Sequence, residues 1–409
     1  MSTMPDQSPA AAAAPLPMLR LKRGEDRRLR SGHLWVFSNE IDNDATPLTA
    51  IAPGALVQVH SDRDQFLGYA YVNPHALICA RIVSRSETGR PDASLWRHRI
   101  RTALALRERL NSEPYGRLIF GEGDGLPGLV LDRYGPVLVG QIATAGMEKL
   151  RPEIEQVVQE LLAPEVLVWK NDGSARELEQ LPKQVLTPIG KAPEELSLIE
   201  NGIRFATPLL AGQKTGWFYD QTANRALLRR FLPPNTRVLD VCSYSGAWAV
   251  TALRAGAREA ICVDSSESAL SFAARNAAAN GVSLGTRKAD AFDALDELQR
   301  AGERFDVVIL DPPAFIKRKK DLPRGQAAYR KLNQLAMRLL EPDALLVSCS
   351  CSFHLGADEL TGLIQSAARS AGRFVQLLAA GGQSPDHPVH PAIPESRYLK
   401  AFFCRVTRE

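Results

Sequence analysis

The chain has 409 residues, of which 45% are hydrophobic and 23% are charged, and its formal net charge is +4. This length exceeds one typical domain and predicts two or three units, each with a core of its own. No run approaches the about 18 uncharged apolar residues of a membrane span, and the Ala-, Pro- and Ser-rich start lacks the basic and apolar regions of a secretory signal. We therefore expect a cytoplasmic protein with a disordered leader over residues 1–18.

Six cysteines are present, and no two of them form a Cys-x-x-Cys pair. This spacing argues against a structural zinc site and against a framework of disulfide bonds. We therefore expect reduced thiols and no bound metal. A buried, inert thiol is the commonest fate of a single cysteine, and we assign it to Cys79, Cys242, Cys262 and Cys404.

Residues 19–90 are predicted to form a small β-barrel-like domain. Short β runs alternate there with turn sequences, and they cover residues 34–37, 55–59, 66–71 and 77–83. A middle α+β domain is expected over residues 91–195. Its pattern indicates two helices and three strands, at residues 95–110, 129–132, 137–142, 147–162 and 166–170.

From residue 196 to residue 409, apolar β runs alternate with segments of helix length. The β runs cover residues 238–241, 260–263, 287–289, 307–310, 344–348, 374–378 and 398–406. The alternation predicts an α/β domain with a Rossmann-like, doubly wound and mostly parallel sheet, which would bind a ligand at the carboxyl ends of its strands. The last two runs are expected to form a hairpin at the sheet edge.

The first three β runs of this domain end in candidate cofactor residues. The first run, with Asp240, leads into a turn that holds Ser243 and a single glycine, Gly246. A nicotinamide site would need three glycines beside the pyrophosphate, whereas one is enough for S-adenosylmethionine. Asp264 ends the second run, where a carboxylate can accept both ribose hydroxyls, and Asp290-Ala291 follows the third, where adenine would lie. Each aspartate alone could be a helix cap, but three at consecutive strand ends favour a cofactor site.

The fourth β run ends in Asp311-Pro312-Pro313-Ala314-Phe315. In amino methyltransferases a related Asp/Asn-Pro-Pro-Tyr motif holds the target nitrogen, and its aromatic ring stacks on the base. Here the aromatic residue, Phe315, comes one position late, which weakens the amino methyltransferase interpretation.

The fifth β run leads into Ser350-Cys351-Ser352, so that Cys351 would face the cleft while Cys349 lies deeper. Carbon 5 of a pyrimidine is a poor nucleophile. An enzyme that methylates it first adds a thiolate to carbon 6, and the resulting enamine can attack a sulfonium methyl group. A cysteine at this position therefore favours carbon methylation. His354 could lower the pKa of the thiol, although a lone histidine is more often a solvated loop residue.

Two basic clusters suit a polyanionic partner such as RNA. Residues 19–33 contain six basic and two acidic residues, and the basic ones include Arg20, Lys22 and Arg23. Residues 317–324 contain five basic residues and one acidic residue, and the basic ones include Lys319 and Lys320. Either cluster could also be an ordinary solvated surface.

Taken together, these residues resemble the bacterial cytosine-C5 methyltransferases of large-subunit ribosomal RNA that carry an N-terminal PUA domain. In the N-terminal part, Gly32-His33-Leu34-Trp35-Val36-Phe37, Phe66-Leu67-Gly68 and Asn73-Pro74 resemble the PUA domain of that family. Before the α/β domain, Gly212-Gln213-Lys214-Thr215-Gly216-Trp217-Phe218-Tyr219-Asp220-Gln221 resembles the family's segment that closes over the cofactor. The similarity covers nearly all of the chain from residue 19 onward.

The resemblance implies that Cys351 is the nucleophile and that Asp311 hydrogen-bonds the cytosine. Related RNA enzymes with a second catalytic cysteine have Pro-Cys where this chain has Pro312-Pro313, so cysteine-assisted product release from that position is excluded. The predicted cofactor-binding residues are Gln213, Lys214, Thr215, Asp240, Ser243, Gly246, Asp264, Asp290, Ala291 and Asp311. The predicted RNA-binding residues are Arg20, Lys22, Arg23, Pro312, Phe315, Lys319 and Lys320.

Two other functions stay open. An amino methyltransferase would act on guanine or adenine through Asp311 without covalent catalysis, so that Cys351 would not be essential. A non-catalytic RNA-binding assembly factor would keep the sheet only as a scaffold. The sequence also leaves open the target nucleotide, the base that removes the carbon 5 proton, and the choice between monomer and homodimer.

Overall fold

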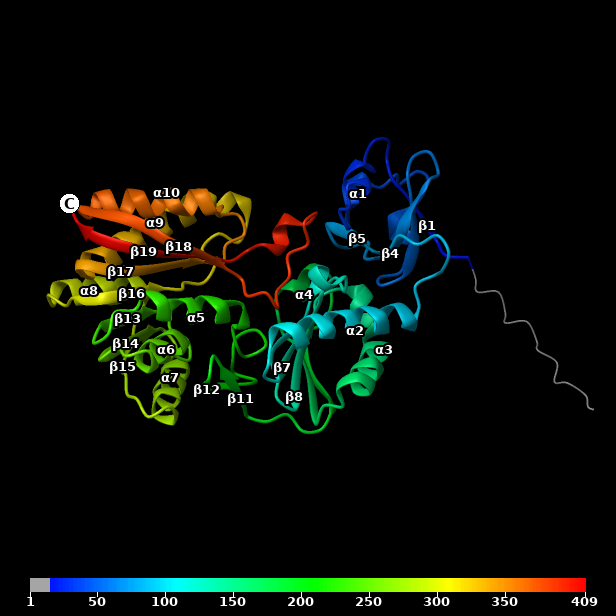
Figure 1. Cartoon of the computed structure of the whole chain (residues 1–409). Helices are drawn as coiled ribbons and strands as arrows, with labels where there is room; N and C mark the ends of the chain where they lie inside the picture. Colours follow the sequence, from blue (N-terminus) through cyan, green and yellow to red (C-terminus); the bar gives the residue numbers. More distant parts are fainter. Residues whose placement is uncertain (1–14) are drawn as a thin grey trace, which may run out of the picture.

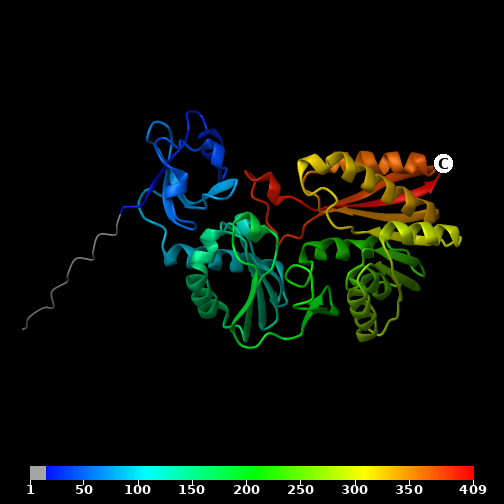
Figure 2. The ribbon, with the colours of Figure 1, turned by 180° about the vertical axis from the view of Figure 1, so that it is seen from behind.

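The computed structural model describes residues 15–409, which form three units in a row (Figures 1 and 2). The predicted leader over residues 1–18 lies outside the described residues except at its end, where Met18 begins the first strand. The described part of the chain forms four sheets, of five, five, two and seven strands. No helix among residues 15–409 combines the length and apolar character that a membrane crossing requires.

The first unit is a five-stranded sheet with the order β1-β3-β4-β5-β2. Its elements are β1 (Met18–Arg20), α1 (Arg27–Arg30), β2 (Trp35–Phe37), β3 (Leu56–His60), β4 (Phe66–Val72) and β5 (Ile78–Ser84). Alternate strand residues point inward, and Val36, Val57 and Val59 are fully buried in its core. This unit is the β domain that the N-terminal pattern predicts.

The second unit is a five-stranded sheet with the order β10-β9-β8-β7-β6 and two long helices. Its elements are α2 (Ala93–Leu110), β6 (Tyr115–Phe120), β7 (Leu129–Tyr134), β8 (Val137–Ile142), α3 (Ala145–Leu162), β9 (Val166–Asn171), α4 (Ala175–Leu178) and β10 (Gln184–Ile189). Apolar residues at helical spacing, such as Trp96 and Ile100 on α2, pack into its core. The α+β prediction for this unit is therefore confirmed.

A two-stranded hairpin of β11 (Glu195–Glu200) and β12 (Ile203–Pro208) joins the second and third units. Its turn residues, Asn201 and Gly202, have φ angles of 52° and 77°, as a two-residue hairpin turn requires. After β12 the chain has no helix or strand until the 3-10 turn η4 (Tyr219–Gln221). We call residues 209–221 the linking segment.

The third unit is a seven-stranded sheet with the order β15-β14-β13-β16-β17-β19-β18. Its strands are β13 (Arg237–Val241), β14 (Glu259–Asp264), β15 (Gly285–Lys288), β16 (Phe305–Leu310), β17 (Leu340–Ser350), β18 (Arg373–Gly382) and β19 (Lys400–Arg408). Strands β13 to β17 pair in parallel, and β19 pairs antiparallel with β17 and β18. The predicted Rossmann-like sheet and the hairpin at its edge are both confirmed.

Helices cover both faces of this sheet (Figure 1). They are α5 (Thr222–Phe231), α6 (Ala247–Arg254), α7 (Glu267–Ala279), α8 (Ala291–Arg300), α9 (Leu322–Leu339) and α10 (Ala357–Ser370). Because side chains alternate along a strand, Val238 of β13 packs with α6 and α7, whereas Leu239 packs with α8, α9 and α10. Strand β13 is thereby fixed in the middle of the sheet, with its carboxyl end open for a ligand.

Candidate active site

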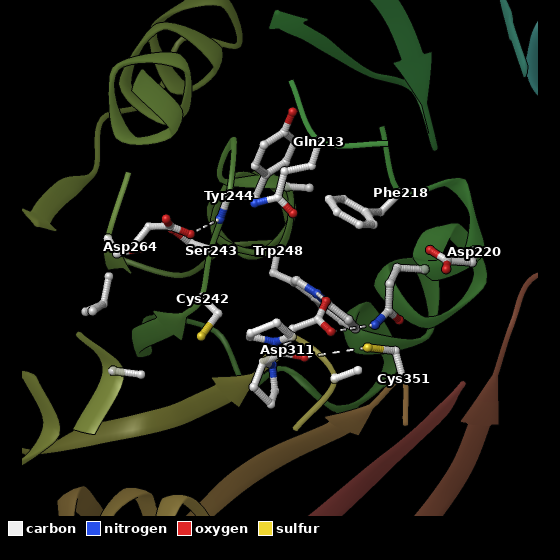
Figure 3. Close-up of a pocket in the computed structure, with 18 of the residues that line it drawn as sticks. Gln213, Phe218, Asp220, Cys242, Ser243, Tyr244, Trp248, Asp264, Asp311 and Cys351 are labelled. Atoms are coloured by element: carbon white, nitrogen blue, oxygen red, sulfur yellow. Dashed lines mark hydrogen bonds between the residues drawn. The ribbon is translucent and has the colours of Figure 1, made fainter. Parts of the chain in front are cut away.

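A cavity of about 540 Å³ opens at the carboxyl ends of β13, β14, β16 and β17 (Figure 3). The chain order reverses at β13, which lies between β14 and β16, and ligands of parallel sheets bind at such a switch point. The opposite wall comes from outside the parallel strands. It consists of side chains between residues 213 and 225 together with Tyr398 and Leu399, just before β19.

One end of the cavity is formed by the loop after β13. Cys242, Tyr244 and Gly246 have φ angles of 62°, 48° and 78°, so that the chain turns sharply into α6. The backbone N–H of Tyr244 donates to Oδ2 of Asp264, and that of Ser266 donates to Oδ1, each at 2.9 Å. A carboxylate has about four acceptor positions, so Asp264 can still accept hydroxyl groups from the cavity.

Next to Asp264 the cavity becomes apolar. Val263, Ala289 and Phe292 line this part, and Asp290 accepts the N–H of Phe292 at 2.8 Å as the cap of α8. A tight polar turn, a carboxylate and an apolar slot thus follow one another along the cavity. This set of groups fits the amino acid part, the ribose and the adenine of S-adenosylmethionine.

Asp311 lies directly after β16, and both of its carboxylate oxygens accept hydrogen bonds. Oδ1 accepts from the side-chain amide of Gln221 at 2.9 Å, and Oδ2 accepts from the indole N–H of Trp248 at 3.0 Å. Burial in the cavity wall raises the pKa of Asp311 above its ordinary value, although these two hydrogen bonds act in the opposite direction. The carboxyl is therefore held in one orientation, in an environment that favours its neutral form.

Cys351 follows the last residue of β17, and its thiol lines the cavity. The sulfur lies 3.9 Å from the carbonyl oxygen of Pro312, so the thiol is next to the Asp311 loop (Figure 3). Burial raises the pKa of Cys351, and the positive charge of Lys214 lowers it. Among the groups that shift the pKa of Cys351, the cation is Lys214 of the linking segment and not His354.

Cys349 differs from Cys351 although both lie near the end of one strand. It is 1% exposed and does not line the cavity, and burial raises the pKa of its thiol well above the ordinary value. The expectation that Cys351 faces the cleft while Cys349 lies deeper is confirmed.

Lys400 holds the chain behind Cys351. Its ammonium donates to the carbonyl oxygens of Ser352 at 2.6 Å and Tyr398 at 2.9 Å. Burial lowers the pKa of Lys400 to about 8, against the opposing effect of the Cys351 thiolate. The loop that carries the thiol is therefore fixed to the edge hairpin.

The structure brings most of the predicted cofactor residues together. Those that line the cavity are Gln213, Lys214, Ser243, Asp264, Asp290, Ala291 and Asp311. Thr215, Asp240 and Gly246 do not line it. The side chains of Thr215 and Asp240 are fully buried and bonded elsewhere, and Gly246 lies against Ala273 of α7.

The predicted RNA-binding residues lie in two places. Pro312 and Phe315 line the cavity, and the exposed Lys319 and Lys320 follow in the 3-10 turn before α9. The others, Arg20, Lys22 and Arg23, lie in the first unit. There Arg20 forms an ion pair with Asp64 at 3.1 Å, and Lys22 donates to the carbonyl oxygen of Asn39 at 2.9 Å.

A second group of cavity residues was not predicted as site residues from the sequence. Asp220, Gln221, Tyr244, Trp248 and Tyr398 line the cavity, and the hydroxyl of Tyr398 donates to Oδ2 of Asp220 at 2.5 Å. Asp220 and Gln221 are the last two residues of the segment that resembles the family's cofactor segment. This resemblance could have identified them as site residues. Nothing in the sequence indicates Tyr398, which the edge hairpin places in the cavity wall.

Within residues 15–409, no group of three or more His, Cys, Asp or Glu side chains could hold a metal ion.

Two family descriptions match the chain. Residues 19–85 match a PUA-like domain, and residues 184–404 match an S-adenosylmethionine-dependent methyltransferase. The solved structure of a protein described as a methyltransferase, in complex with SAH, is 21% identical and covers 95% of this chain and 100% of its own, with a TM-score of 0.82. A methyltransferase structure from Streptococcus mutans has the same identity and coverage and a TM-score of 0.81. These two structures support the fold.

Curated relatives match over almost the whole length. A protein of Erwinia tasmaniensis named ribosomal RNA large subunit methyltransferase I is 35% identical over 398 residues, which cover 95% of this chain and 99% of that protein. The protein of the same name from Cronobacter sakazakii is 34% identical over 399 residues, with the same coverage. The match therefore includes all three units.

Proposed function

Because the chain belongs to the family of ribosomal RNA large subunit methyltransferase I, we propose that it methylates carbon 5 of a cytosine in large-subunit ribosomal RNA. S-adenosylmethionine is the cofactor of its methyltransferase domain. One observation carries the choice of carbon 5, namely that the thiol of Cys351 lines the cofactor cavity beside Asp311. Methylation of an exocyclic nitrogen needs no thiol at that place.

When bound, S-adenosylmethionine would supply an electrophilic methyl group at the centre of the cavity. Asp264 would accept the ribose hydroxyls, and Asp290 and Ala291 would contact the adenine, because they lie along one wall in that order. Ser243 and Gln213 would contact the amino acid part. Asp311 would complete this wall at the end nearest the thiol.

The three predicted residues that do not reach the cavity would shape its wall. Oδ2 of Asp240 accepts the N–H of Ala249 at 3.1 Å, which fixes the start of α6 against β13. Gly246 permits the left-handed turn and the close approach to α7. Thr215 anchors the linking segment through a hydrogen bond to Asp132 of β7.

Cys351 would be the nucleophile of the reaction. Its thiolate adds to carbon 6 of the cytosine, and the electron pair displaced from the ring double bond makes carbon 5 nucleophilic. After carbon 5 has gained the methyl group it loses its proton, the ring double bond forms again and the thiolate leaves. Burial raises the pKa of this thiol, and the charge of Lys214 acts against that effect.

Asp311 would hold the cytosine ring. Its pKa is raised by burial, and a neutral carboxyl can donate a hydrogen bond to nitrogen 3 of the ring. This hydrogen bond withdraws electrons from the ring and so assists the addition at carbon 6. Gln221 and Trp248 would keep the carboxyl in place through their hydrogen bonds.

The target base would enter the cavity only after leaving its neighbours in the RNA. Phe315 lines the cavity beside Asp311, and its ring centroid lies 4.8 Å from that of Tyr329. Phe315 would therefore offer an aromatic surface near the base. The PUA-like domain and the basic residues before α9 would bind the surrounding phosphates in the cytoplasm.

Mass spectrometry of nucleosides from ribosomal RNA incubated with the protein and labelled S-adenosylmethionine tests the proposal. We expect 5-methylcytosine from the wild type, and none from Cys351→Ala, whose S-adenosylmethionine affinity should stay near that of the wild type. Cys349→Ala is the matched control, because this thiol lies outside the cavity, and most of its activity should remain.

RNA that contains 5-fluorocytosine should form a covalent adduct with the wild type that survives denaturing electrophoresis, because fluorine cannot leave as a proton does. A labelled N-methylated purine, or methylation by Cys351→Ala, would replace this proposal with amino methylation through Asp311. Binding of cofactor and RNA without any methylated product would indicate an assembly factor.

A further inference from the structure

The linking segment, residues 209–221, forms one wall of the cofactor cavity without a helix or strand before η4. Gln213, Lys214 and Phe218 from this segment line the cavity. Lys214 has a φ angle of 50°, a left-handed conformation that the surrounding structure must maintain in a residue with a side chain. Gly216 follows with a φ angle of 121°, which glycine adopts without strain. Contacts from outside must therefore hold the segment in place.

Strand β7 of the second unit takes part in three of these contacts through consecutive residues, and Lys170, Thr207 and Tyr244 bond further carbonyl oxygens of the segment. The hydroxyl of Thr215 donates to Oδ2 of Asp132 at 2.5 Å. The hydroxyl of Tyr134 donates to the carbonyl oxygen of Thr215 at 3.3 Å, and that of Tyr219 donates to the carbonyl oxygen of Arg133 at 2.9 Å. Thr215 is fully buried at this contact and lies between Lys214 and Gly216, the two residues with positive φ angles.

Asp132 is itself fixed by a buried ion pair. Its two oxygens bond the Nε and the terminal nitrogen of Arg117, each at 2.8 Å, and the side chain of Asp132 is fully buried. The carboxylate is thus held by contacts within the second unit, and a hydrogen bond to an ionised carboxylate is among the stronger ones in proteins.

Arg117 also contacts the loop between β18 and β19, which carries Tyr398 of the cavity wall. The backbone N–H of Arg117 donates to Oδ2 of Asp386, at 3.0 Å. Asp386 lies in the loop between β18 and β19, which extends from the third unit to the other two units (Figures 1 and 2). This loop ends at Tyr398, which lines the cavity and bonds Asp220 of the linking segment.

We propose that Asp132, in the second unit, is a positioning residue for cofactor binding in the third unit. Through Thr215 it fixes the backbone that presents Gln213 and Lys214 to the cavity. The second unit would then be a part of the cofactor site and more than a spacer between the RNA-binding domain and the catalytic domain. This inference rests on the use of S-adenosylmethionine and does not depend on which base is methylated.

Replacing Asp132 would leave Arg117 as an unpaired buried charge, which is strongly destabilising. Thr215→Val is the better test, because valine keeps the shape and removes only the hydroxyl. We expect S-adenosylmethionine affinity, measured by calorimetry on the full chain, to fall about tenfold, which corresponds to about 1.4 kcal/mol. Thr215→Ser, which restores the hydroxyl, should bind within about twofold of the wild type.

Thr144→Val is the matched control. Thr144 is a buried threonine that bonds the carbonyl oxygen of Pro127 at 3.2 Å, away from the linking segment. It should lower the melting temperature with S-adenosylmethionine affinity unchanged. The inference is overturned if Thr215→Val binds as the wild type does, or if Thr144→Val loses as much affinity. Calorimetry tests the positioning role, whereas nucleoside analysis tests the target base. Failure of one proposal can therefore be distinguished from failure of the other.

Discussion

The thiol of Cys351 is under two opposing influences. Burial raises its pKa, and the charge of Lys214 lowers it. If the thiolate is the nucleophile, the methylation rate rises with pH as the thiol ionises. Lys214→Met removes the cation and should raise the pKa of Cys351, so the rising part of the rate profile should move to higher pH. Single-turnover rates at saturating S-adenosylmethionine, measured across the pH range, check this prediction.

Lys214→Arg is the control for this experiment, because it keeps the positive charge, and its profile should coincide with that of the wild type. A Lys214→Met profile that rises at the wild-type pH would show that the charge does not act on the reactive group. Saturation with cofactor is essential, since Lys214 also lines the cavity and its loss can weaken cofactor binding.

Single residues could be predicted from the sequence where a strand end fixes their position. Asp264, Asp311 and Cys351 each end or follow a buried strand, and the structure places all three around one cavity. The cation near the thiol could not be found in this way. His354 is close in sequence, but the cation that lowers the pKa of the thiol is Lys214, from the linking segment, and the thiolate also interacts with Lys400 of β19.

At the scale of elements, the regular part of the third unit was predicted well because its inner parallel strands β13, β14, β16 and β17 are mainly apolar and alternate with amphipathic helices. Strands β1, β6, β10, β11 and β12 were missed. In β6, Gly116 and Arg117 interrupt the apolar pattern by which a strand is recognised. The charge of Arg117 is compensated by Asp132 on the neighbouring strand. Strand β10 is an edge strand without a fully buried residue. Such strands are defined by distant partners, which a local pattern does not show.

The turn from β13 into α6 depends on Gly246. Its φ angle is 78°, and a Cβ atom there would lie 2.7 Å from the Cβ of Ala273 on α7. We expect Gly246→Ala to lower the free energy of unfolding by at least about 1 to 3 kcal/mol through backbone strain alone. The close contact would increase this loss. Urea denaturation followed by tryptophan fluorescence measures it.

Gly362 offers the matched control, because it lies inside α10 and a Cβ atom there would meet nothing within 4 Å. Gly362→Ala should stabilise the protein by about 0.5 to 1 kcal/mol, the usual gain inside an exposed helix. Equal stability of Gly246→Ala and the wild type would mean that the turn can adopt another conformation.

Across the whole molecule, the cofactor half of the site was predictable because it comes from consecutive strand ends of one sheet. In the opposite wall only Gln213 and Lys214 were predicted, through the family resemblance, and the rest was not, because it is assembled from three separate parts of the chain. Asp220 and Gln221 precede the sheet, Tyr398 follows the loop of the edge hairpin, and Asp132 holds the segment from another unit. Their meeting depends on how the units pack, which neither periodicity nor local motifs specify.

The placement of the basic residues separates two contributions to RNA binding. Lys319 and Lys320 are exposed and follow the cavity residue Phe315, whereas Arg20 and Lys22 already have partners in the first unit. Each phosphate contact to single-stranded RNA contributes about 0.7 to the slope of log affinity against log salt. We expect the Lys319→Ala/Lys320→Ala variant to lose up to about 1.4 from this slope.

The Arg20→Ala/Lys22→Ala/Arg23→Ala variant should lose less slope per residue, because an arginine bound to Asp64 releases fewer counterions from RNA. Titration of a ribosomal RNA fragment at several salt concentrations gives both slopes, and the melting temperature of each variant shows whether the domain is intact. A Lys319→Ala/Lys320→Ala slope equal to that of the wild type would place the RNA away from the start of α9. The target base would then have to reach Cys351 past the edge hairpin, where Tyr398 lines the cavity.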